Sequence, residues 1–142
     1  MSAANLIRRL ERLGRPAMQK AEHKLAQRLY KIHSEAVQAA PLDLGKLRQS
    51  IQVRIEEGRR SGFVTAGNIN DNSKNYAAFV EFGTGTKVQV PKGFEKMAIR
   101  FKGRVRIKSM RAMPYLIPAF LRHKRLFVDD IRKIIADEVG RP

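Results

Sequence analysis

The chain of 142 residues contains no cysteine and has no long apolar run. Without cysteine it can form no disulfide, thiolate nucleophile or cysteine-ligated zinc site, which suits a reducing compartment. No stretch approaches the roughly 20 uninterrupted apolar residues that cross a bilayer. Residues 1–14 carry Arg8, Arg9 and Arg12 among their leucines, unlike an export signal. We therefore expect a single domain over residues 1–142, with no membrane span and no secretion by that route.

Acidic residues are also few. Thirteen Asp and Glu stand against 29 Lys and Arg, which gives a formal net charge of +16 and a sequence pI near 11.0. Such an excess attracts nucleic acid or acidic protein surfaces, but it specifies neither a fold nor a base sequence. A basic surface that only keeps the protein soluble is the alternative.

The clearest periodic pattern predicts a long helix over residues 17–40. Pro16 fits its first turn and Pro41 ends it, because the residue before a proline is disfavoured in helical geometry. Residues 1–16 are expected to form a short helical or frayed segment. The apolar positions of the long helix recur at steps of three or four and are Met18, Ala21, Leu25, Leu29, Ile32, Ala36 and Ala39.

Alternating residues then predict a β-hairpin. Apolar and polar side chains alternate over residues 51–55, and the turn at 58–62 leads into a second strand at 63–66. Residues 76–82 are predicted to form a short helix that Asn75 caps, although their alternation fits a strand almost equally well.

Residues 84–112 are predicted to form a long loop, reaching to about residue 97, and then a basic hairpin. Four apolar residues at odd positions between 99 and 107 flank a three-residue turn, which sets the hairpin register. No acidic residue occurs from Lys96 to Arg125. This charge can contact DNA phosphates nonspecifically, meet an acidic partner or remain solvated. The candidate interface residues are Arg100, Lys102, Arg104, Arg106, Lys108 and Arg111.

A final helix is expected to begin at Pro118 and to end before Gly140. The order of elements therefore indicates an α+β fold. In this fold the long N-terminal and C-terminal helices pack on an antiparallel β-sheet, accompanied by a short central helix and the basic hairpin.

No motif for catalysis, metal binding or a cofactor is evident. His23 and His33 point about 80° apart and lie about 15 Å apart along one helix, so they cannot share a metal. We expect them and His123 on solvated or partly buried faces. The acidic residues are scattered and are interpreted as surface charge. Residues 83–87 lack the full phosphate-loop pattern and are interpreted as a turn.

Three segments together resemble the phage head–tail joining family, also called neck or tail-completion proteins. They are APLDLGKLRQSI at 40–51, YAAFVEFGT at 76–84 and MPYLIPAF at 113–120; Leu44 departs from the family's usual threonine. The resemblance spans about residues 18–139. The motif residues are Pro41, Asp43, Gly45, Leu47, Arg48, Ser50, Tyr76, Glu81, Gly83, Thr84, Pro114 and Pro118.

Physical chemistry gives these motif residues structural roles. Gly45 and Gly83 allow backbone conformations that other residues avoid, and Asp43 and Glu81 can accept bonds from local backbone N–H groups. Pro114 and Pro118 fix the start of the final helix.

The resemblance implies a structural, non-enzymatic subunit of a tailed-phage virion, made in the host cytoplasm. It implies a homo-oligomeric ring, a hexamer or dodecamer, between the portal connector and the tail. Its expected partners are connector or head-closure proteins and tail-terminator or tail-tube proteins, with nonspecific contact to passing DNA and none to membrane. The alternative from the charge alone is a nonspecific basic DNA-binding protein.

Overall fold

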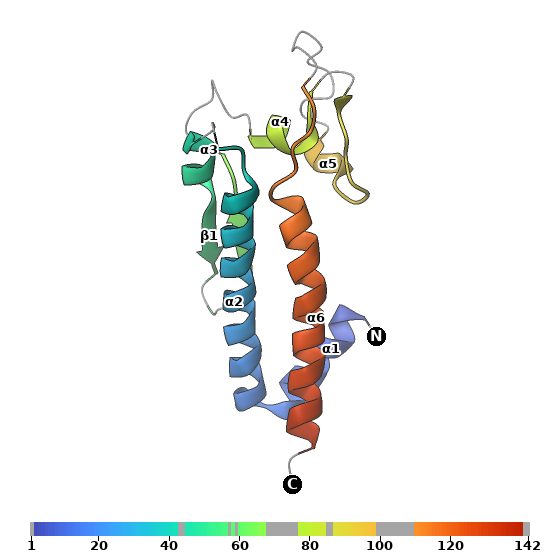
Figure 1. Ribbon diagram of the computed structural model, residues 1–142. Helices are drawn as coiled ribbons and strands as arrows, with labels where there is room; N and C mark the ends of the chain where they lie inside the picture. Colours follow the sequence, from blue (N-terminus) through green and yellow to red (C-terminus); the bar gives the residue numbers. More distant parts are fainter. Residues whose placement is uncertain are drawn as a thin grey trace.

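Two long helices form the body of the molecule. The computed structural model describes residues 2–42, 45–56, 58, 60–67, 77–84, 87–98 and 110–140. Helices α2 (Arg15–Ala39) and α6 (Ile117–Val139) lie side by side and run in opposite directions (Figure 1). The remaining elements are α1 (Ala3–Leu13), α3 (Gly45–Ser50), β1 (Gln52–Ile55), β2 (Gly62–Thr65), α4 (Ala77–Phe82) and α5 (Glu95–Ala98).

The predicted long helix is confirmed, beginning two residues earlier than expected. Pro16 occupies its first turn, and Ala40 before Pro41 is extended with φ −62° and ψ 142°. The predicted apolar face is buried at Ala21, Leu29, Ile32 and Ala36, whereas Ala39 is exposed. The segment before it is a complete helix, α1, and Gly14 with φ +87° separates the two.

A core at one end of the molecule joins α1, α2 and α6. Helix α1 presents Leu6 and Leu10 to Ile131 and Ile135 of α6, and Ala17 and Ala21 of α2 allow the helices to approach closely. Burying each of the larger side chains stabilises the fold by about 1.5–3 kcal/mol. The apolar face of the amphipathic helix α1 is therefore buried against α2 and α6 of the same chain.

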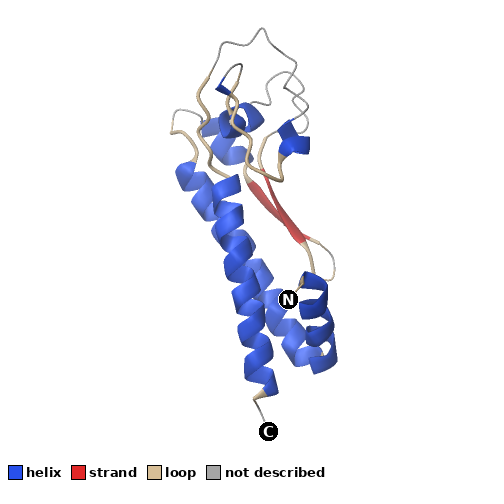
Figure 2. Ribbon diagram, turned by 90° about the vertical axis from the view of Figure 1, so that its right-hand side faces the viewer, coloured by secondary structure: helices blue, strands red, loops and turns tan. Residues whose placement is uncertain are grey.

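The predicted hairpin is confirmed in position. Strands β1 and β2 pair antiparallel, with Val53 opposite Val64 and Ile55 opposite Gly62. Val53, Ile55 and Val64 are half-buried, and the hairpin packs against α2 (Figure 2). A Cβ at Gly62 would lie 2.3 Å from Cδ1 of Leu29. The absence of a side chain at Gly62 therefore lets the backbone of β2 lie close to Leu29 of α2.

The short helix α4 confirms the preference for helix over strand at 76–82. One difference lies at residues 95–98, where a turn of helix, α5, ends the segment expected to be loop. The predicted second hairpin at 99–107 lies outside the described residues, as do the caps expected from Asp43 and Asn75.

Candidate interaction surface

The three motif segments meet in a second core, at the opposite end of α2 from α1. Ala40, Leu47 and Ile51 come from the first segment, Ala77 and Val80 from the second, and Tyr115 from the third; Ala36 of α2 completes the cluster. Segments that are far apart in the sequence thus share one buried contact. The buried apolar residues of the three motifs therefore have a role in folding, which is to pack against one another.

The first motif fixes the end of α2. The guanidinium of Arg48 donates to the carbonyl of Ala40 at 3.0 and 3.1 Å and to that of Gln38 at 3.3 Å, which satisfies carbonyls that the end of a helix leaves unpaired. Ser50 Oγ donates to the carbonyl of Leu47 and accepts from the N–H of Gly67. Leu47 is buried, and Pro41 is half-buried.

The predictions of a special backbone conformation for Gly45 and Gly83 have different outcomes. Gly45 begins helix α3 and does not adopt positive φ, so the prediction of a special conformation for it is wrong: a helix start needs none. Gly83 does adopt φ +79°. A Cβ there would lie 2.7–2.9 Å from the carbonyls of Lys87 and Met110 and the nitrogen of Ala112.

Residues 80–84 and 110–113 run side by side around Gly83. Thr84 donates its N–H to the carbonyl of Met110 at 2.9 Å, and its Oγ1 accepts the N–H of Met110 at 2.8 Å. The N–H of Met113 donates to the carbonyl of Val80 at 2.8 Å. These bonds position the segment that leads into α6.

Glu81 is buried and caps α6 from another helix. Its Oε2 accepts the N–H groups of Tyr115 at 3.0 Å and Leu116 at 2.9 Å, and its Oε1 accepts that of Ile117 at 2.9 Å. The N-terminus of a helix has unpaired N–H groups and a partial positive charge, so a carboxylate stabilises it. The prediction that Glu81 binds local N–H groups is wrong, because its partners lie 34 to 36 residues away.

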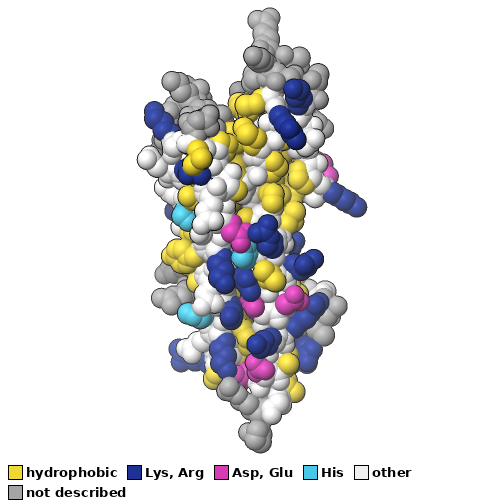
Figure 3. Space-filling view, viewed as in Figure 1, with side chains coloured by type: hydrophobic (Ala, Val, Ile, Leu, Met, Phe, Trp, Pro, Cys, Tyr) yellow, Lys and Arg dark blue, Asp and Glu magenta, His cyan; other side chains and the backbone are white. Residues whose placement is uncertain are grey.

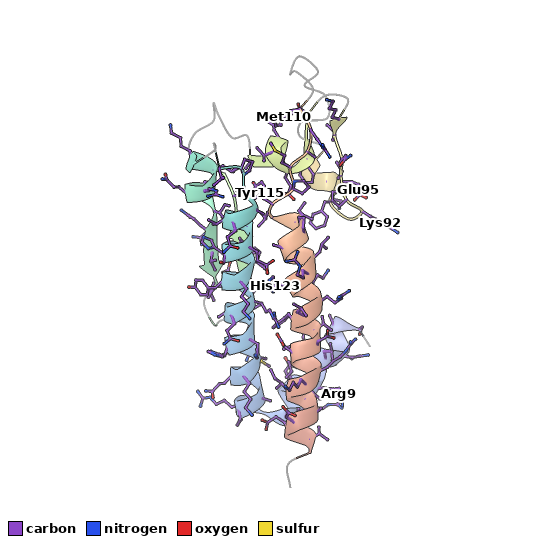
Figure 4. The ribbon with its side chains drawn as sticks, in the orientation of Figure 1. Arg9, Lys92, Glu95, Met110, Tyr115 and His123 are labelled. Carbon is purple, nitrogen blue, oxygen red and sulfur yellow. The ribbon has the colours of Figure 1, made fainter. Side chains whose placement is uncertain are left out.

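Tyr115 lies beside this carboxylate, between the ends of α2 and α6 (Figure 4). Its hydroxyl donates to the carbonyl of Ala77 at 3.1 Å. Burial, and then the negative charge of Glu81, raise the pKa of the Tyr115 hydroxyl well above its usual range. Tyr115 therefore remains a donor and holds α4 to the start of α6.

A polar network crosses the contact between α2 and α6. Arg28 binds Asp130 through two bonds of 2.7 and 3.1 Å and also donates to Nδ1 of His123 at 3.3 Å. Because Arg28 can only donate, Nε2 of His123 carries the hydrogen that is shared with Glu35 at 2.7 Å. Arg122 binds the other oxygen of Glu35 at 2.6 Å.

Of the three histidines, His123 is more deeply buried than the sequence indicated, whereas His23 and His33 lie as expected. His123 is buried between the two long helices, as Figure 4 shows, instead of lying on a solvated or partly buried face. His33 is half-buried and bonds the carbonyl of Ile51, and His23 is exposed. Among the described residues, no group of three or more His, Asp or Glu is arranged to hold a metal ion.

A hollow opens just above this network, where α2 ends and α6 begins. Its volume is about 330 Å³. It is bordered by Glu35, Gln38 and Ala39 of α2, by Pro114 and Tyr115, and by Pro118, Ala119 and Arg122 of α6. Figure 3 shows apolar side chains gathered over the upper half of this face of the molecule, and charged side chains over its middle and lower parts.

Exposed apolar residues continue from this hollow along α6. Pro114 and Pro118 are exposed, and Leu121, which is 45% exposed, follows Pro118 by one helical turn. Met113 beside Pro114 is 43% exposed. We name this set, with the exposed cations Arg111, Arg122 and Arg125, the Pro118 surface.

The start of α6 also carries Phe120, which contacts another part of the chain. Phe94 meets its ring edge-on with centroids 6.3 Å apart, and Nζ of Lys124 lies 6.0 Å from its centre. Phe120 is therefore partly covered within the molecule. It is not included in the Pro118 surface.

The predicted interface residues are only partly described. Arg111 is exposed, whereas Arg100, Lys102, Arg104, Arg106 and Lys108 lie outside the described residues, as do Asp43 and Tyr76. Sequence reasoning identified Pro114 and Pro118 but missed the hollow, Tyr115 and Glu35. The signal in the sequence was the position of Pro114 and Pro118 within a stretch that contains no acidic residue. In the portion of the chain that the structure describes, no helix is long and apolar enough to span a membrane.

A comparison with protein families matches residues 4–83 to the family described as "Bacteriophage HK97-gp10, putative tail-component". This match includes the first motif and all but one residue of the second, and it ends before the third. No curated protein and no solved structure was found to match the chain.

Proposed function

Because the chain belongs to the HK97 gp10-like family of phage tail components, we propose that it is a neck, head–tail joining or tail-completion subunit of the virion. Its copies form a ring, a hexamer or a dodecamer, between the portal connector and the tail. The subunit is made in the host cytoplasm and acts in the particle. Its role is to fit against other proteins, and we propose no reaction for it.

The observation that carries this proposal is that buried contacts of the motif residues hold an exposed surface in a fixed position. Glu81 and Gly83 hold the start of α6 against α4, and the same start of α6 exposes Pro118 and Leu121. An interface that is ordered before binding strengthens an association, because ordering side chains and loops during binding costs free energy. The motifs provide that order.

The partners proposed from this position are the connector or head-closure proteins on one side and the tail-terminator or tail-tube proteins on the other. Contact with passing DNA is proposed as nonspecific, because charged side chains bind phosphates without reading the base sequence.

A phage that carries a nonsense mutation in this gene tests the proposal. We expect filled heads and separate tails in the lysate, visible by electron microscopy, and joined particles after complementation with the wild-type gene. A mutant that makes infectious, fully joined particles would refute the proposed role. A tail-assembly control, a nonsense mutation in the tail-tube gene, should give heads without tails.

A nonspecific DNA-binding role is the second candidate, favoured by the net charge of +16. A gel-shift series with DNA of arbitrary sequence, run at rising salt concentration, separates the two candidate functions. Binding by the free subunit whose affinity falls with a log–log slope of about −0.9 per phosphate contact would favour this second role. Weak binding at physiological salt would favour the first.

A further inference from the structure

The Pro118 surface combines an apolar centre with an excess of positive charge. Its centre consists of Pro114, Pro118 and Leu121 beside the hollow of about 330 Å³. Arg122 borders the hollow, Arg125 follows Leu121 by about one helical turn, and Arg111 precedes Met113 by two residues; all three are exposed. The acid at its edge, Glu35, already holds Arg122 and His123. The net charge around the apolar centre is therefore positive.

We propose that the Pro118 surface docks an acidic segment of a different virion protein, with an apolar side chain of that segment in the hollow. This inference rests on the proposed role in the particle, since it names the kind of partner that this surface takes there. Carboxylates of the partner face Arg111 and Arg125, while its apolar side chain removes Pro118 and Leu121 from water. Charge guides the encounter and burial supplies most of the affinity.

A second copy of this chain fits the surface poorly. Each copy has 13 acidic residues against 29 basic ones, so a second copy offers little negative charge to this basic surface, and we place the ring contact elsewhere on the chain. Many of the described acids already hold a cation of their own chain, and Glu81 is buried. These internal pairs are Glu22 with Arg60, Glu35 with Arg122, Asp129 with Arg132, Asp130 with Arg28 and Glu138 with Lys20.

Nucleic acid fits the surface less well than an acidic protein does. Phosphates would satisfy the arginines, but a phosphate backbone offers no apolar group to cover Pro118 and Leu121. An acidic protein segment satisfies both parts of the surface. The combination of charge and exposed apolar area is what favours this partner.

Photo-crosslinking in assembled particles tests the inference. The photoreactive residue p-benzoylphenylalanine is introduced at Leu121 by nonsense suppression, and irradiated virions are analysed by mass spectrometry. Val139, which is 63% exposed, is the matched control. It lies 18 residues further along α6, which is five full turns, and therefore on the same helical face about 27 Å away. We expect a product at position 121 with one different virion protein, within a net-negative segment, and a different product or none at 139.

Other results overturn the inference. A product that joins two copies of this chain would assign the surface to the ring contact instead. A product with DNA, with a net-positive segment, or no product at 121 would also contradict it while leaving the virion role intact. Absence of the chain from purified particles would refute the proposed function itself, and the inference with it.

A charge reversal gives a second measurement. Arg125→Glu is expected to lower the yield of the product at position 121 about tenfold, because it places like charge against the acidic partner. Lys133→Glu makes the same kind of change two turns further along α6 and should leave the yield within about twofold, as expected for a charge outside the interface. Equal yields from the two variants would contradict the role of charge.

Discussion

The carboxylate of Glu81 accepts the backbone N–H of Ile117 at 2.9 Å, across 36 residues of sequence. Helix α6 therefore begins where α4 places it. Leu116, at the N-cap, has no polar side chain, and Pro118 has no N–H to satisfy. The position of the exposed residues at the start of α6, Pro118 and Leu121 among them, thus depends on one buried side chain of another helix.

Replacing Glu81 by Gln should destabilise the fold strongly. The amide has one acceptor oxygen where the carboxylate has two, so a backbone donor at the start of α6 faces an NH₂ group. We expect a loss of about 3 kcal/mol in the free energy of unfolding. Urea denaturation measures it, with Glu11→Gln on the exposed face of α1 as the control. If both variants unfold at the wild-type midpoint, the capping role is wrong.

Replacing Gly83 by Ala should cost more than the same change at Gly14. Both glycines have positive φ, but the Cβ at Gly83 meets three backbone atoms within 2.9 Å, whereas at Gly14 it meets no described atom within 4 Å. We expect about 1–3 kcal/mol at Gly14, whose φ of 87° and ψ of −168° suit glycine alone, and about 2 kcal/mol more at Gly83, where the Cβ also meets backbone atoms. Thermal unfolding of the two variants measures the difference. Equal melting temperatures would mean that the segment at 110–112 yields easily.

The pair of Arg28 and Asp130 predicts a pH-dependent effect. The hydrogen bond from Arg28 is the main cause that lowers the pKa of Asp130 below 3.8. A lowered pKa stabilises the fold fully above 3.8, and this contribution is lost as the pH falls through the folded-state pKa. Asp130→Asn should therefore cost about 2 kcal/mol at pH 7. The cost should shrink under strongly acidic conditions, where wild type is protonated too.

Urea unfolding of wild type and Asp130→Asn at neutral and at acidic pH measures this change. Asp129→Asn is the control, since Asp129 is exposed and its bond to Arg132 is 3.5 Å long. An equal cost of Asp130→Asn at both pH values would show that its effect is packing and not charge.

Tyr115 predicts an unusual titration. The chain has three tyrosines, and burial with the nearby Glu81 raises the pKa of Tyr115 above 10.0. A raised pKa contributes stability below pH 10, and this contribution falls as the pH rises through the folded-state value. We expect the phenolate absorbance of Tyr115 to develop only with alkaline unfolding. Subtracting the curve of Tyr115→Phe identifies it; a component that titrates at ordinary pH without unfolding would contradict the buried position.

Local pattern predicted the elements of this fold but not their long-range contacts. The spacing of Leu29, Ile32 and Ala36 predicts a helix because its period is a property of neighbouring residues. The alternation at 51–55 predicts the hairpin for the same reason. Hydrogen bonds from the N–H of Ile117 to Glu81 and from Arg28 to Asp130 join residues 36 and 102 positions apart, and no local period encodes them.

The candidate site was predicted in part. Pro114, Pro118 and Arg111 were identified from a motif and from charge. Glu35 and Gln38, which line the hollow together with Pro114 and Pro118, come from the C-terminal end of α2, and the packing of the two long helices brings them there. His123 was expected nearer to solvent, because a polar residue among basic ones resembles an exposed face until the acid opposite it is known.

Cryo-electron microscopy of purified particles at the head–tail junction tests the virion role directly. We expect a closed ring of six or twelve copies of this chain between the portal connector and the tail, with α2 and α6 recognisable as paired rods in each copy. Complete particles in which that junction is built from other proteins, with this chain elsewhere or absent, would contradict the role.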